Sequence, residues 1–158
     1  MLTLLEHSGV NLTPSKIENA ALIVIDAQNE YLTGSLPLVG IKPALAEIQK
    51  LLAEARAAGS PVYHVVHNAK PGAKLFNPES KLSHIISSVA PVEGEDIIIK
   101  PLPNSFCHTN LHEKLKELGK MEIVICGFMT HLCVSSTARA AIEYGYKTTI
   151  VSKACATR

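Results

Sequence analysis

Short apolar runs, many of them β-branched, alternate along the chain with longer segments that have helical periodicity. The runs cover residues 21–26 (ALIVID), 61–67 (PVYHVVH), 96–99 (DIII), 123–126 (IVIC) and 148–151 (TTIV). The first run is apolar on both faces, as expected for a central parallel strand buried between two layers. The alternation predicts an α/β fold in which helices cover both faces of a mainly parallel sheet.

Helical signals fill the stretches between the predicted strands. Pro43 suits the first turn of a helix whose apolar positions recur until Gly59. Thr109 or Asn110 is expected to cap a second helix that runs to Leu118, and a third helix is expected over about residues 131–144. Residues 68–91 show only weak periodicity, which predicts a long loop with one helical turn. Loops of this length in compact domains tend to be functional.

Composition favours one globular domain over residues 1–158, because the chain is 47% hydrophobic and 18% charged and can bury a substantial core. The formal net charge is +1 without a basic stripe, so nucleic acid is not expected as a partner. No apolar run is long enough to span a bilayer, and the amino terminus lacks a signal-peptide pattern. We therefore expect no membrane partner, a cytoplasmic location and reduced cysteines.

Three polar residues that could take part in catalysis lie at the ends of expected strands or just after them. Asp26 ends the first, Lys100 ends the third, and Cys133 opens the helix after the fourth. Ligands of open parallel sheets bind at the carboxyl ends of the strands, so these side chains are expected to share one crevice. Taken singly, the Asp could cap a loop, the Lys could be solvated and the Cys could be packing.

Together the three residue types predict nucleophilic catalysis. Cys133 would attack as a thiolate, with its pKa lowered by the helix amino terminus and by Lys100. Asp26 would accept the thiol proton and return it to the leaving group.

Three segments resemble the signatures of isochorismatase-like cysteine hydrolases, in the order found in that family. They are residues 23–31 (IVIDAQNEY), 99–106 (IKPLPNSF) and 125–138 (ICGFMTHLCVSSTA). The resemblance implies a three-layer α/β/α fold, an Asp26–Lys100–Cys133 triad, and a cis peptide between Phe128 and Met129. It also implies an oxyanion hole formed by the backbone N–H groups of Met129 and Cys133, and hydrolysis of amide-type C–N bonds through a thioester.

One departure from the family pattern concerns metal. Nicotinamidases of this superfamily carry an Asp-x-His…His cluster after the second strand, and residues 64–70 (HVVHNAK) lack it. His64 and His67 are separated by an odd spacing, which places them on opposite faces of a strand. The sequence therefore predicts neither a metal nor a cofactor.

The expected partner is a small-molecule substrate. Tyr31, Phe128, His131 and Leu132 are predicted to line its pocket, which suits a largely uncharged acyl group. No arginine lies near the three signatures before Arg139, so a clamp for a carboxylate is not expected.

A second departure is the end of the sequence. Relatives continue with a helix, a strand and another helix, whereas this sequence stops at Arg158. We expect a sheet without its closing segment and a homo-oligomer, either a dimer or a tetramer, that covers the open edge. The rival hypothesis is a weak or inactive homologue that serves as a binding, regulatory or thiol-redox protein.

Overall fold

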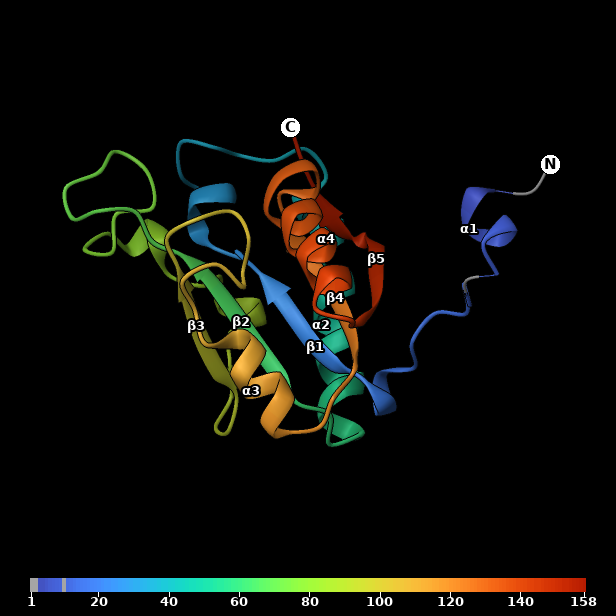
Figure 1. The fold of residues 1–158 in the computed structure, drawn as a ribbon. Helices are drawn as coiled ribbons and strands as arrows, with labels where there is room; N and C mark the ends of the chain where they lie inside the picture. Colours follow the sequence, from blue (N-terminus) through green and yellow to red (C-terminus); the bar gives the residue numbers. More distant parts are fainter. Residues whose placement is uncertain (1–2, 10) are drawn as a thin grey trace.

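Five parallel strands form the centre of the molecule in the order β3-β2-β1-β4-β5 (Figure 1). The computed structural model describes residues 3–9 and 11–158. The strands are β1 (Ala21–Ile25), β2 (Val62–His67), β3 (Asp96–Lys100), β4 (Glu122–Phe128) and β5 (Lys147–Ala156). The predicted parallel α/β architecture is confirmed, and the main difference is that β4 and β5 are longer than expected.

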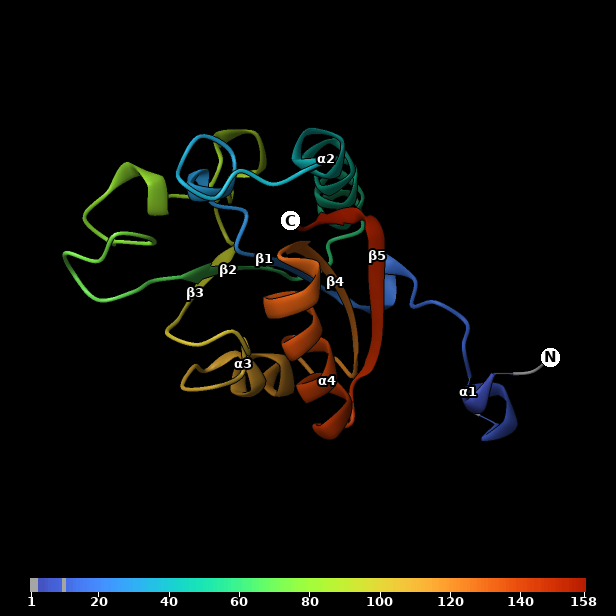
Figure 2. The ribbon, with the colours of Figure 1, turned by 90° about the horizontal axis from the view of Figure 1, so that it is seen from above.

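Helices cover both faces of this sheet. The helix α2 (Ile41–Ala57) packs on one face, and α3 (Leu111–Glu117) and α4 (Ser135–Glu143) lie on the other (Figure 2). All five residues of β1 are buried: Leu22 and Val24 contact the α2 side, while Ile23 faces α3 and α4. This two-sided burial explains why the β1 sequence is apolar without alternation.

Gly127 allows β4 to lie closer to β1 than a residue with a side chain at this position would permit. Its φ is +114°, and a Cβ added there would lie 2.0 Å from the carbonyl oxygen of Ile25. The ladder between β4 and β5 also shifts register between Ile125 and Gly127. Glycine at this position therefore serves close packing where β4 leads into the segment that carries Cys133.

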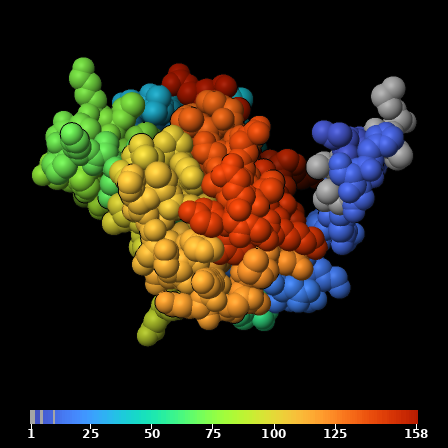
Figure 3. Space-filling view, in the orientation of Figure 1, coloured from blue at the N-terminus to red at the C-terminus, as the bar shows by residue number. Residues whose placement is uncertain are grey.

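The remaining helical turns are short. The helix α1 (Leu4–His7) stands away from the sheet, opposite the lobe formed by the chain after β2 (Figure 3). The 3-10 turns at Ile17–Asn19 and Asn29–Tyr31 were not predicted. Two more, at Lys81–Ser83 and Ser87–Val89, lie in the long loop, where one helical turn was expected. A π-helical turn at Thr130–Val134 forms the start of the helical segment predicted from about residue 131. None of the described helices is long and apolar enough to cross a membrane.

Candidate active site

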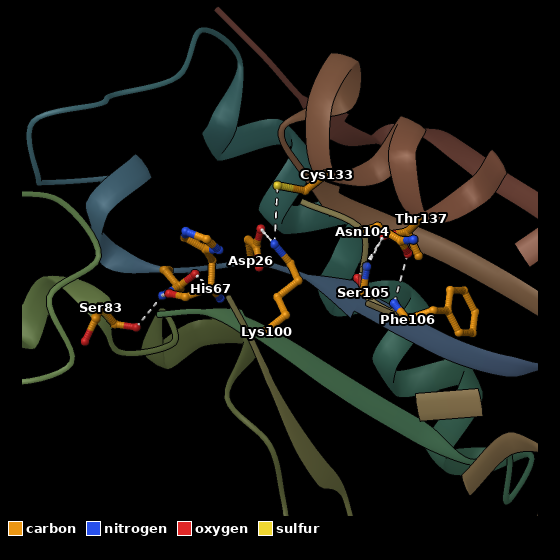
Figure 4. A network of polar contacts seen from close by, with 10 residues as sticks. Asp26, His67, Ser83, Lys100, Asn104, Ser105, Phe106, Cys133 and Thr137 are labelled. Atoms are coloured by element: carbon orange, nitrogen blue, oxygen red, sulfur yellow. Dashed lines mark hydrogen bonds and ion pairs between the residues drawn. The ribbon is translucent and has the colours of Figure 1, made fainter. Parts of the chain in front are cut away.

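Asp26, Lys100 and Cys133 meet at the carboxyl edge of the sheet (Figure 4). The Lys100 Nζ lies 2.9 Å from the Asp26 Oδ2 and 3.4 Å from the Cys133 Sγ. Asp26 and Lys100 are fully buried, and Cys133 is 4% exposed. The structure therefore brings together the three residues that the sequence singled out.

The sheet order explains why a lysine is suited to this cluster. Asp26 follows the central strand β1, whereas Lys100 ends β3, and β2 lies between these strands. The long flexible stem of a lysine can carry a positive charge past the intervening strand. Asp26 has a left-handed φ of 49°, a conformation that Asp tolerates better than most residues.

The pKa of the Cys133 thiol is shifted in the direction opposite to the one expected from the sequence. Burial raises the pKa of Cys133 to about 12, the charge of Asp26 adds to this rise, and Lys100 opposes it. Burial likewise raises the pKa of Asp26 against the opposing effect of Lys100. The predicted lowering of the Cys133 pKa is therefore wrong for the resting site. Cys133 also lies in the π-helical turn Thr130–Val134, before α4 begins, and not in the first turn of the α-helix.

Two buried hydroxyl side chains join the loop after Lys100 to the helix after Cys133. The Ser105 N–H donates to the Thr137 Oγ1 at 3.0 Å, and the two hydroxyl oxygens lie 2.8 Å apart (Figure 4). Both side chains are fully buried. They hold in place the two segments that carry the amine and the thiol. Both residues lie in the family signatures, but their pairing has no signal in a single sequence.

The residues that follow Asp26 anchor the long loop between β2 and β3. The Gln28 Nε2 donates to the carbonyl oxygens of His67 at 2.9 Å and Ser83 at 2.7 Å, and its Oε1 accepts from the His67 N–H. The Asn29 Nδ2 donates to the carbonyl oxygen of Lys81. The signature that contributes Asp26 therefore also fixes the loop beside it, a role that the sequence did not suggest.

The four predicted pocket residues occupy two different environments. Tyr31 and Phe128 are buried, and their rings pack edge to face with centroids 6.0 Å apart. His131 and Leu132 are exposed, and the His131 Nδ1 contacts the Thr157 Oγ1. Their contact with a substrate stays a prediction.

The peptide bond between Phe128 and Met129 is cis, as the resemblance implied. The proposed oxyanion donors belong to this turn, and their role stays a prediction.

The two strand histidines have different partners. The His64 Nε2 lies 2.9 Å from the Glu95 Oε2, while the His67 ring packs against Phe76 with centroids 5.2 Å apart. Within residues 3–9 and 11–158 no group of three or more His, Cys, Asp or Glu side chains is arranged to hold a metal ion.

A parallel α/β fold with an Asp–Lys–Cys cluster at the carboxyl edge of its sheet defines the class of this protein. The family model described as Isochorismatase domain matches residues 20–158. The chain therefore belongs to the isochorismatase family and is a hydrolase of that family.

Individual members of the family resemble this chain in sequence and in structure. A secreted isochorismatase effector of Verticillium dahliae is 39% identical over 150 residues, which cover 95% of this chain and 79% of that protein. The crystal structure of an isochorismatase from Pseudomonas putida is 44% identical with a TM-score of 0.95, covering 100% of this chain and 81% of that one. The N-carbamoylsarcosine amidase from Thermoplasma acidophilum is 26% identical with a TM-score of 0.84, covering 89% and 85% of the two chains.

Proposed function

We propose that this protein is a cysteine hydrolase that cleaves an amide-type C–N bond of a small molecule, with Asp26, Lys100 and Cys133 as its catalytic residues. The observation that carries the proposal is the position of the Lys100 Nζ, which contacts both the Asp26 carboxylate and the Cys133 thiol in a buried site. The similarity to an amidase that acts on an N-carbamoyl compound supports the choice of bond.

The raised pKa values fit a mechanism in which the thiol is activated only when substrate is present. As the Cys133 Sγ attacks the carbonyl carbon, its proton passes to the Asp26 carboxylate, whose raised pKa makes it a better proton acceptor. Lys100 stabilises the negative charge on the sulfur during attack. The backbone N–H groups of Met129 and Cys133 are proposed to stabilise the oxyanion.

The second half of the reaction returns the site to its starting state. The C–N bond breaks as Asp26 gives its proton to the departing amine, which leaves a thioester on Cys133. Water then attacks the thioester carbon while Asp26 takes a proton from the water. The C–S bond breaks, the sulfur regains that proton, and the carboxylic acid product leaves.

A panel of small amides, carbamoyl compounds and ureido compounds tests this proposal through ammonia release. Cys133→Ser should reduce turnover by a factor on the order of 10³ or more, because a serine hydroxyl ionises far less readily than a thiol and is a weaker nucleophile. Cys107→Ser, at a partly buried thiol outside the cluster, is the matched control and should retain activity. Circular dichroism should show that both variants keep the fold.

Two results would contradict the proposal. Equal ammonia release by the wild type and Cys133→Ser would place the chemistry elsewhere. Absence of release across the whole panel would favour a binding or regulatory role.

We also propose that the protein forms a homo-oligomer and acts in the cytoplasm. Self-association is supported by Ile97 and Ile99, two exposed apolar side chains on the edge strand β3. Fractionation of the native host would test the cytoplasmic location.

A further inference from the structure

His67 lies at the candidate active site, yet the proposed mechanism gives it no task. It is the last residue of β2, its register partner on β3 is Lys100, and β2 lies next to the strand that ends before Asp26. Figure 4 draws its side chain together with Asp26 and Lys100. Gln28 holds the backbone of His67 on both sides, because it accepts from the N–H and donates to the C=O.

The imidazole has unused capacity for hydrogen bonding. Its Nδ1 is buried and has no hydrogen-bond partner among the described residues, although the side chain as a whole is only partly buried. Buried polar atoms are nearly always paired in folded proteins, so an unpaired one at a site needs a reason. Burial and the charge of Lys100 lower the pKa of His67 to about 4, so the ring is uncharged at neutral pH and offers one donor and one acceptor.

Phe76 packs against the imidazole and helps to fix its position. The ring centroid of Phe76 lies 5.2 Å from that of His67 and 5.3 Å from that of Tyr31. Phe76 has a left-handed φ of 52°, which a bulky side chain rarely adopts. Its carbonyl oxygen accepts from the Ala69 N–H at 2.9 Å, and the Glu30 Oε2 accepts from its own N–H at 3.4 Å. Strained backbone that is held in this way is common where a protein contacts a ligand.

We propose that His67 is a substrate-binding residue, and that its imidazole, packed against Phe76, selects a substrate with a second hydrogen-bonding group next to the scissile amide. This inference rests on the proposed function and extends it to the class of substrate.

Three probes with the same branched skeleton test the inference: malonamide, biuret and 3-methylbutanamide. The first two carry a second carbamoyl group, and the third has an isopropyl group of similar shape in its place. The wild type should hydrolyse malonamide or biuret with a kcat/KM about tenfold above that of 3-methylbutanamide, the factor expected for one hydrogen bond. His67→Phe keeps a planar ring without nitrogens and should bring the ratio to about one by slowing only the polar probes.

His67→Gln, which keeps one donor and one acceptor, should retain part of the preference. If His67→Phe fails to fold, as judged by thermal unfolding, the comparison of the wild type with His67→Gln and Phe76→Leu replaces it, and both variants should reduce the ratio. An unchanged ratio, or an equal loss on all three probes, would overturn the inference while leaving the proposed function intact. Absence of Cys133-dependent release from all three probes would reject this substrate class, and the wider panel would then decide whether the proposed function fails with it.

Discussion

At Cys133, burial has a larger effect on the thiol than the neighbouring ammonium group. The Sγ contacts the Lys100 Nζ, yet the pKa of the thiol is raised to about 12, since burial and the charge of Asp26 both disfavour the thiolate. The resting site is therefore expected to hold a protonated sulfur and to generate the thiolate during attack. An active-site thiol with a lowered pKa would be ionised before substrate arrives.

This difference predicts the pH dependence of alkylation at Cys133. Below its pKa the thiol keeps its proton, so the reactive fraction should grow with pH throughout the accessible range. The rate of iodoacetamide labelling at Cys133, followed by mass spectrometry without substrate, should keep rising from about pH 7 to about pH 10. A rate that levels off near neutral pH would show an ionised thiol and contradict the expectation. Cys133→Ser identifies the labelled peptide.

Single residues also show what the sequence could reveal of the site. Asp26, Lys100 and Cys133 were identifiable because each follows a recognisable strand and belongs to a family signature. The direction of the Cys133 pKa shift was not identifiable, because it depends on burial, which no motif encodes. The position of His67 depends on Gln28 and Phe76, which are distant in sequence, so its neighbours were equally hidden.

At the level of elements, β1, β2 and β3 were predicted nearly to the residue, whereas β4 extends beyond its predicted bounds at both ends. The strand β5 was predicted to be much shorter, because Ser152 and Lys153 interrupt its apolar pattern although the ladder with β4 continues through Ala156. The long loop between β2 and β3 was predicted correctly as a loop, although it contains two short helical turns where one was expected. Its anchoring by the residues after Asp26 was not, since side-chain bonds to backbone carbonyls leave no periodic signal.

The anchoring of this loop can be tested with Gln28→Ala. The variant loses three hydrogen bonds to backbone groups of His67 and Ser83, which should cost about 1–3 kcal/mol and loosen the loop. Hydrogen exchange should become faster between Phe76 and Ile86, and urea unfolding should give the loss in stability. Gln49→Ala is the matched control, because Gln49 donates to the Ser88 carbonyl at an exposed position. Equal exchange in both variants would show that Gln28 does not anchor the loop.

At the level of the whole molecule, the sequence predicts self-association from an open edge after the last strand, and the structure shows a second candidate surface on the opposite edge strand, β3. Ile97 and Ile99 are 51% and 59% exposed on this strand. The same two side chains line a groove of about 320 Å³ together with Val66, Ile85 and Pro91. An exposed apolar strand edge is a surface that folded proteins usually cover.

Size-exclusion chromatography with light scattering tests this expectation. The wild type should have a mass that is a multiple of 17.0 kDa, and the double variant Ile97→Lys/Ile99→Lys should shift toward the monomer. Ile142→Lys changes an exposed isoleucine on α4 and should leave the mass unchanged. A monodisperse wild-type monomer at micromolar concentrations would refute self-association.

The order of strands in the sheet has a consequence for how the chain acquires activity. The three residues of the cluster come from segments after β1, at the end of β3 and after β4, and the strand pairs that align them are all parallel. Parallel pairing joins distant parts of a chain. The chain therefore loses conformational entropy when the long loops close, before the stabilising contacts have formed. Secondary structure can return early during refolding, whereas the distance between the Lys100 amine and the Cys133 thiol is set only when β1 to β4 have all paired. Recovery of catalysis would therefore report the pairing of β1 to β4, and a nascent chain would remain inert until the segment after β4 that carries Cys133 has been synthesised.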